Sequence, residues 1–428
     1  MKRIDNINIT LKKLKESDLQ WIYAMLFSSS IYFVPLRTML IAIGNYIHIG
    51  LGSIFSKISL LFFGCIFLLP ILKKKEKFTR DMLVIFSLLM FSWLLGIWEN
   101  LDYLSEDINI GVSIFVKAFP YYCIARKIKD WDQTKDILYH FAIVTTIFIG
   151  IAVFFELLDD TLYADGYIYN QFYGIIICPA AVVSLIAFWE KKETSHLINL
   201  GISCLLMYIF GARSPFLCLA LAFVILMMKT FFYAVRYKRI AKFYIVLICL
   251  CLIVISSGLI IILNLEDTID TLKVQEGQRF LYLLQRGMLL NSDSRIQIYK
   301  NTLNLIGQYP ILGVGLIKDR VLLAEVAGVI HDFSGYYAHN IFLEFILQYG
   351  IFIGGFLNSI LMYLIYICLF KEKNSARGWI SVFGVSYGIG LLLVSSSAFE
   401  HEEFWLFVGI AVGILIENSQ YRKNINTI

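Results

Sequence analysis

The sequence predicts an all-α polytopic membrane protein with about twelve transmembrane helices and one long outward-facing loop that contains short amphipathic helices. Of its 428 residues, 59% are hydrophobic and only 16% are charged, a composition that ordinary soluble domains do not have. Apolar runs of about the 20 residues that cross a bilayer recur between short charged segments along the whole chain. Together these two observations exclude a soluble globular protein.

The apolar runs define the predicted spans and the domain organisation. The spans lie near residues 19–43, 53–72, 82–98, 108–125, 137–158, 169–189, 197–211, 214–233, 243–264, 340–370, 378–398 and 404–417. No internal repeat or low-complexity linker divides them, so we expect one integral membrane domain over residues 1–428. Residues 1–18 are charged and lack a cleavage site, so the first span is expected to be the targeting signal.

Lysine and arginine alternate with acidic residues from loop to loop. Basic clusters occur at residues 73–80, 126–129, 191–192, 236–242 and 371–377, whereas acidic loops without bases occur at 99–107, 159–165 and 400–403. Because basic short loops stay in the cytoplasm, this pattern predicts cytoplasmic termini and places residues 265–339 outside. The net charge of +5 is then an insertion signal, and no nucleic-acid partner is expected.

Residues 265–339 form the longest polar passage of the chain and are predicted to be an extracytoplasmic active-site loop. Ile296, Tyr299 and Leu303 have helical spacing, which favours short helices lying on the membrane. The sequence Pro310-Ile-Leu-Gly-Val-Gly315 breaks that pattern and predicts a tight turn. The passage ends at His339-Asn340, where a new apolar run begins. Polar groups gathered there indicate that a polar substrate is handled at the outer mouth of the bundle.

Three residues suggest the chemistry. The guanidinium groups of Arg213 and Arg295 match the geometry of phosphate, and two of them neutralise a diphosphate leaving group without a metal. His339 titrates near neutrality and is suited to take a proton from an attacking hydroxyl. No Cys/His spacing predicts a metal and no glycine-rich phosphate loop is present, so no cofactor is expected. A lipid diphosphate donor and a sugar hydroxyl acceptor suit such a site.

These motifs resemble those of a known family. Gly211-Ala-Arg213-Ser, then Arg295 with Pro310-Ile-Leu-Gly-Val-Gly315, then His339-Asn340-Ile-Phe-Leu343 with Gly350 are similar to the shared pattern of the O-antigen ligase and O-antigen polymerase superfamily. The resemblance covers roughly residues 195–415. Pro215, two positions after Arg213, departs from the small residues that the family pattern has there.

The resemblance implies a C-type membrane glycosyltransferase of the bacterial inner membrane. Its donor would be an oligosaccharide linked to undecaprenyl diphosphate, transferred with inversion and without a metal. Arg213 and Arg295 would clamp the diphosphate, and His339 would activate the acceptor. We expect a polymerase of O-antigen, capsule or exopolysaccharide repeat units, with flippase and chain-length regulator proteins as implied partners.

Other functions stay open. An O-antigen ligase or a protein O-oligosaccharyltransferase would use the same donor with another acceptor. A polysaccharide or lipid transporter is less favoured, because interrupted helices in two corresponding halves are not evident.

Each site residue also has a structural alternative. Arg213 would snorkel to headgroups, Arg295 would pair with Asp293, and His339 would donate to a loop carbonyl while Asn340 caps the next helix.

Three further residues are predicted to support the site. Lys117, in the fourth predicted span, either faces a wet cavity or pairs internally. Arg37 contacts a lipid phosphate or snorkels, and Glu344 supports the site or is favoured by the start of its helix. His331 and His401 are the reserve candidates for the base.

Overall fold

Every element in the described part of the chain is a helix, as predicted. The computed structural model describes residues 16–46, 78–99, 110–154, 171–210, 213–236, 294–329, 333, 336–372 and 375–426. The helices are α2 (Glu16–Tyr46), α4 (Arg80–Glu99), η2 (Ile114–Ala118), α6 (Phe119–Lys127), α7 (Trp131–Phe154), α8 (Gln171–Lys191), α9 (Thr194–Ile209), α10 (Arg213–Arg236), α14 (Ser294–Gln308), α15 (Lys318–Val326), α16 (Ile341–Tyr366), η4 (Ile367–Lys371), α17 (Ala376–Phe383), η5 (Gly384–Ile389), η6 (Leu391–Leu393) and α18 (Glu402–Asn426).

Seven helices within the described residues are long and apolar enough to cross a membrane. They are Ser17–Ile41, Arg80–Trp98, Trp131–Val153, Phe172–Lys191, Ser214–Phe232, Ile341–Lys371 and Ala376–Leu393. Each overlaps a predicted span, and the stretch Ile341–Lys371 is broken at Gly350, as described below. The protein is therefore a multi-pass membrane protein.

The other predicted spans have different outcomes. The run 197–211 is the shorter apolar helix Thr194–Ile209, and 404–417 lies within α18. The predicted span 108–125 is helical from residue 110 and continues to residue 127, but the π-helical turn η2 interrupts it. The predicted spans 53–72 and 243–264 lie outside the described residues.

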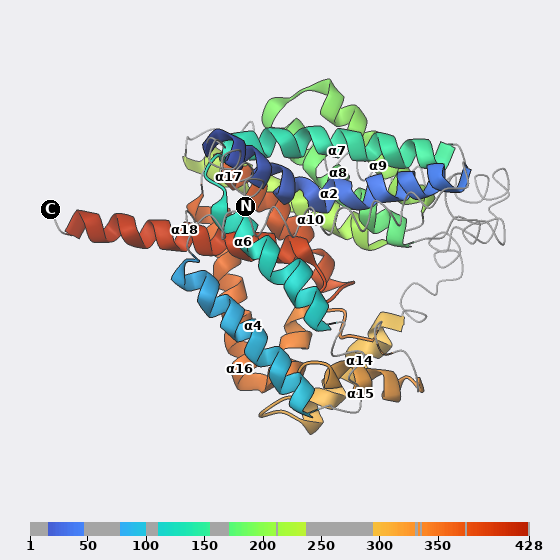
Figure 1. The fold of residues 1–428 in the computed structure, drawn as a ribbon, viewed down its shortest axis with the longest axis vertical. Helices are drawn as coiled ribbons and strands as arrows, with labels where there is room; N and C mark the ends of the chain where they lie inside the picture. Colours follow the sequence, from blue (N-terminus) through green and yellow to red (C-terminus); the bar gives the residue numbers. More distant parts are fainter. Residues whose placement is uncertain are drawn as a thin grey trace, which may run out of the picture.

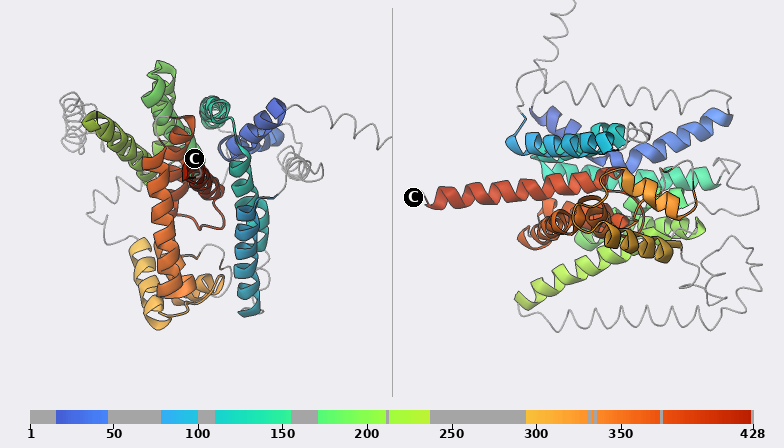
Figure 2. Two further views of the ribbon diagram at one scale, coloured as in Figure 1. Left: turned by 90° about the vertical axis from the view of Figure 1, so that its left-hand side faces the viewer. Right: turned by 90° about the horizontal axis from the view of Figure 1, so that it is seen from below.

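The helices form two neighbouring groups around α18 (Figure 1). In one group α2 packs against α7, and α8 packs against α9 and α10. The other group contains α4 and α16, with α14 and α15 beside the end of α16, as Figure 2 also shows. α18 packs along α6 with an almost fully buried apolar segment, so it forms the centre of the main core.

α16 is a helical hairpin, which corrects the prediction of one continuous span over 340–370. Gly350 has φ +74° and ψ 174°, which ends the helix and restarts it. Beyond this break the chain reverses, because Asn358 Nδ2 donates to the carbonyl of Phe342 at 3.0 Å. In a continuous helix these residues would be about 24 Å apart. Residues 341–349, the first arm, therefore lie alongside residues 351–366, the second arm.

The proline–glycine turn is docked onto this break. Val314 N–H donates to the carbonyl of Leu347 at 2.8 Å, and Gly315 N–H donates to that of Gln348 at 2.9 Å. In return, Ile351 N–H donates to the carbonyl of Pro310 at 2.8 Å. A continuous helix would use these α16 groups internally, so the break at Gly350 frees them for the turn. We call these three hydrogen bonds the turn–hairpin junction.

The junction requires glycine at two facing positions. Gly313 has φ +73°, and a Cβ there would lie 2.5 Å from the backbone nitrogen of Gly350. A Cβ on Gly350 would lie 2.0 Å from the carbonyl oxygen of Ile311. The two backbones approach too closely for any side chain, and both glycines have a conformation that L-residues avoid. The turn predicted from Pro310 and its glycines is therefore confirmed, and its partner is Gly350.

Gly350→Ala is expected to destabilise the protein by about 2–4 kcal/mol, because the left-handed backbone and the displaced junction both cost free energy. Gly355→Ala is the matched control, since a Cβ at Gly355 meets no atom within 4 Å and alanine favours a helix. Thermal unfolding of both variants in detergent measures the difference. Equal melting temperatures would show that the junction does not hold the hairpin.

Candidate functional site

Arg295 lies at the start of α14 and faces the start of α10. Its Nη2 donates to the hydroxyl of Ser214 at 3.2 Å, and Ser214 is buried. Ser214 follows Arg213, the first residue of α10. The side chain of Arg213 lies outside the described part of the structure. The fold thus brings the beginnings of the two arginine-bearing helices together, although they are distant in the sequence.

His339 directly precedes the first arm of α16. Its backbone has φ +50°, a left-handed conformation that few residues other than glycine adopt. The hydroxyl of Tyr299, on α14, donates a hydrogen bond to the backbone carbonyl of His339 at 3.3 Å. Asn340 caps the helix, since its side-chain oxygen accepts from the N–H groups of Phe342 and Leu343. The predicted capping role of Asn340 is confirmed.

The imidazole of His339 is neutral and has unused hydrogen-bonding capacity. Burial, and secondly the nearby Arg295 guanidinium, lower the pKa of His339 to about 4. Its Nδ1 is buried and has no hydrogen-bond partner among the described residues. A neutral imidazole can accept a proton at pH 7. An unsatisfied buried polar atom in a native structure often marks a functional position.

Three helix N-termini meet at this place. The Arg295–Ser214 hydrogen bond joins the beginnings of α14 and α10, and the Tyr299–His339 hydrogen bond joins α14 to the beginning of α16. Each helix N-terminus carries about half a positive charge, and at α16 the Asn340 side chain already accepts from two of the N–H groups. With the Arg295 guanidinium added, the site favours an anion such as phosphate.

A network of polar side chains lies between the first arm and α15. Glu344 is fully buried and accepts from the hydroxyl of Ser397 at 2.5 Å. Gln348, one helical turn later, donates to Asp319 at 2.8 Å. Glu344 lies in the first turn of α16, as its structural alternative expected, and it is also part of this buried network. It helps to join the first arm to α15 and to the segment before α18.

The remaining predicted residues lie elsewhere. Lys117 pairs internally, since its Nζ donates to the carbonyl of Glu400 at 3.3 Å. Arg37 lies on an exposed face of α2, which packs against α7, α6 and α8. His401 faces the Glu403 carboxylate at 3.0 Å and is buried, and His331 lies outside the described residues.

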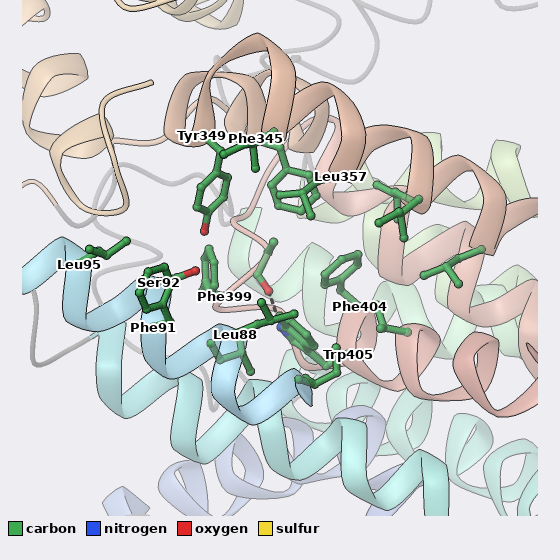
Figure 3. A pocket seen from close by; sticks show the side chains of 18 residues that line it. Leu88, Phe91, Ser92, Leu95, Phe345, Tyr349, Leu357, Phe399, Phe404 and Trp405 are labelled. Atoms are coloured by element: carbon green, nitrogen blue, oxygen red, sulfur yellow. Dashed lines mark hydrogen bonds between the residues drawn. The ribbon is translucent and has the colours of Figure 1, made fainter. Parts of the chain in front are cut away.

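An apolar cavity of about 410 Å³ lies between α4, α16 and α18 (Figure 3). The first arm contributes Phe345 and Tyr349 to its wall, the second arm contributes Leu357, and α18 contributes Phe404 and Trp405. The same short arm that begins at His339 thus also lines a space suited to hydrocarbon.

Sequence reasoning missed two polar residues, Tyr337 beside His339 and Arg320 beside Tyr337. The ring of Tyr337 packs on the His339 ring with 4.2 Å between centroids, and the Arg320 guanidinium lies 5.7 Å from the centre of the Tyr337 ring. Tyr337 precedes His339 by two positions, and Arg320 closely follows the glycine turn. In the sequence, the proximity of these two residues to the motifs was the one feature that could have pointed to them.

Comparison with known proteins gives one family match. Residues 198–358 match the model of a protein family described as O-antigen ligase. This match supports the O-antigen ligase/polymerase superfamily for that part of the chain. The matched segment contains Arg213, Arg295, the proline–glycine turn, His339 and Gly350. It ends at residue 358, before the limit near 415 that the sequence resemblance suggested. No curated protein and no solved structure gives a match.

Replacing Arg295 is expected to raise the pKa of His339. In Arg295→Gln the cation is lost but burial remains, so the pKa rises from about 4 toward, without reaching, the ordinary value of 6.5. Diethyl pyrocarbonate modifies only neutral imidazole, so the modification of His339, followed by peptide mass spectrometry, should begin to fall at a higher pH in this variant. Arg295→Lys keeps the charge and should keep the original midpoint. An unmoved midpoint in Arg295→Gln would contradict the proximity of the two groups.

Proposed function

We propose that this protein is a membrane glycosyltransferase that polymerises lipid-linked polysaccharide repeat units. The observation that supports it best is the half-buried, neutral His339, whose Nδ1 has no hydrogen-bond partner among the described residues and which lies beside Arg295 where three helix N-termini meet. The site thus combines a proton acceptor with an anion-binding region. Transfer of a glycan from a diphosphate to a hydroxyl needs both.

The proposed reaction is a single inverting displacement. The acceptor hydroxyl oxygen attacks the anomeric carbon of the donor glycan, and its proton passes to the His339 imidazole. The bond between the anomeric carbon and the diphosphate oxygen breaks, and its electron pair stays on that oxygen. Arg295, the helix N-termini and, in this proposal, Arg213 stabilise the negative charge of the released undecaprenyl diphosphate.

The donor lipid has a suitable environment. The protein is embedded in the membrane through several apolar helices. The apolar cavity lined by Phe345, Tyr349 and Trp405 offers contact for hydrocarbon. A lipid-linked donor would therefore reach the site from the membrane.

A ladder assay tests the polymerase. Purified protein incubated with an undecaprenyl-diphosphate-linked repeat unit alone should give a ladder of longer glycans, because donor and acceptor are then the same molecule. A ligase would give no ladder without a lipid A core or protein acceptor.

The same assay tests the two site residues. His339→Ala should abolish joining of glycans yet leave donor binding intact. Arg295→Lys should lower the rate about 10²–10³-fold, since the point charge of an ammonium cannot replace the planar guanidinium with its two parallel donors. Near-normal polymer from correctly inserted His339→Ala would refute the role of His339.

Full turnover is expected in EDTA, because the proposed leaving-group stabilisation uses only arginine and helix N-termini. The assay compares initial rates with and without the chelator. Loss of activity that magnesium or manganese restores would disprove the metal-independent mechanism.

We also propose that the site faces the outer side of the bacterial inner membrane, with both termini in the cytoplasm. A cysteine introduced at Ser292 should react with an impermeant maleimide added outside intact cells, and one at Lys74 should not, because the basic loops stay inside. Each variant is also labelled after cell lysis as its control. The reverse pattern would overturn this topology.

A further inference from the structure

The reaction proposed above does not use an ion pair between buried Arg320 and half-buried Glu400 that lies beside the site. Arg320 is 5% exposed, and its Nη1 lies 2.7 Å from Oε1 of Glu400. Both the Glu400 and the Asp319 carboxylates favour the charged form, so the pKa of Arg320 is raised above its ordinary value although burial acts against it. A permanent cation is thus enclosed close to the candidate base.

One aromatic ring separates this cation from His339. The Arg320 guanidinium carbon lies 5.7 Å from the centre of the Tyr337 ring, which suits a cation–π contact. The Tyr337 ring centroid is in turn 4.2 Å from that of His339, at an interplanar angle of 46°. Burial, and secondly the Glu400 carboxylate, raise the pKa of Tyr337, so this phenol stays neutral.

His339 has few other restraints on its ring. A catalytic imidazole is commonly oriented by a hydrogen bond to its second nitrogen, but Nδ1 of His339 has no partner among the described residues. The Tyr299 hydroxyl holds the carbonyl of His339 and leaves the ring torsion open. Among the described residues, the ring of Tyr337 is the aromatic ring packed against the imidazole, and it restrains the plane of that ring.

Two hydrogen bonds anchor the ion pair, one on each side. Asp319, beside Arg320, is held to the first arm by Gln348 at 2.8 Å. Lys117 donates to the backbone carbonyl of Glu400 at 3.3 Å, which fixes the other partner. The Lys117 hydrogen bond, one of the two alternatives expected from the sequence, thus holds the backbone of the residue whose carboxylate pairs with Arg320.

We propose that Arg320, held by Glu400, is a positioning residue that orients the His339 imidazole through the ring of Tyr337. The expected effect on kcat rests on the proposed function. The expected effect on the orientation of the His339 ring does not. Arg320 does not contact the substrate in this proposal. It keeps the Tyr337 ring in place, and that ring keeps the imidazole in the orientation needed for proton transfer.

Four variants separate positioning from folding. Tyr337→Phe keeps the ring and should retain activity, whereas Tyr337→Leu and Arg320→Met should lower kcat about 10–100-fold and leave the donor KM unchanged, because the anion site is intact. Arg320→Lys keeps the charge and should restore part of kcat. Arg126→Met is the control, because it breaks a comparable pair, with Asp81 at 2.8 Å, and should lower stability without changing kcat.

A second measurement needs no activity. His339 should react several-fold faster with diethyl pyrocarbonate at pH 7 in Tyr337→Leu and Arg320→Met than in the wild type or Arg126→Met, because its ring is released. If the wild type makes no polymer but this difference is seen, the proposed function fails and the positioning contact stands. Wild-type kcat and wild-type reactivity in Arg320→Met, in correctly inserted protein, would overturn the positioning role.

Discussion

The arrangement of the site depends on one exchange of backbone hydrogen bonds. Because Gly350 interrupts α16, the carbonyls of Leu347 and Gln348 become available to the turn that carries Gly313 and Gly315. This exchange turns an apolar stretch into a hairpin and fixes α14 before the turn and α15 after it. His339 begins the first arm, so its position follows from the same exchange. Each hydrogen bond is worth only about 1 kcal/mol net, but burying these groups unpaired would cost more.

The electrostatics of the site come from the backbone as much as from side chains. One described arginine, Arg295, reaches the region where α10, α14 and α16 begin. Helix N-termini and a guanidinium both favour an anion, and burial together with the guanidinium disfavours a protonated imidazole. In the proposed reaction the same arrangement would therefore stabilise the leaving-group charge and keep the base neutral. The proposed anion-binding region and the proposed proton acceptor are compatible neighbours for this reason.

The sequence predicted what is encoded locally. Composition predicted the helical membrane fold, proline and glycine predicted the turn, and the spacing of Ile296 and Leu303 predicted the amphipathic α14. It did not predict the hairpin, because hydrophobicity is continuous across Gly350 and the partner of that glycine lies far upstream. The pairing of Lys117 with Glu400, 283 positions apart, is a tertiary contact of the same kind. Arg320 looked like an ordinary polar residue because its burial arises only when α15 packs against the hairpin.

The first arm also sets a fixed spacing. Residues 341–349 at about 1.5 Å each separate the imidazole from the tip of the hairpin by about 14 Å. Both ends of this distance are fastened, one by the backbone of the turn and the other by the asparagine cap. A single inserted residue would move the ring by about 1.5 Å and rotate it by about 100°. The length of this arm is therefore as strict a requirement as the identity of the residues at its ends. Natural insertions and deletions are expected outside residues 341–349.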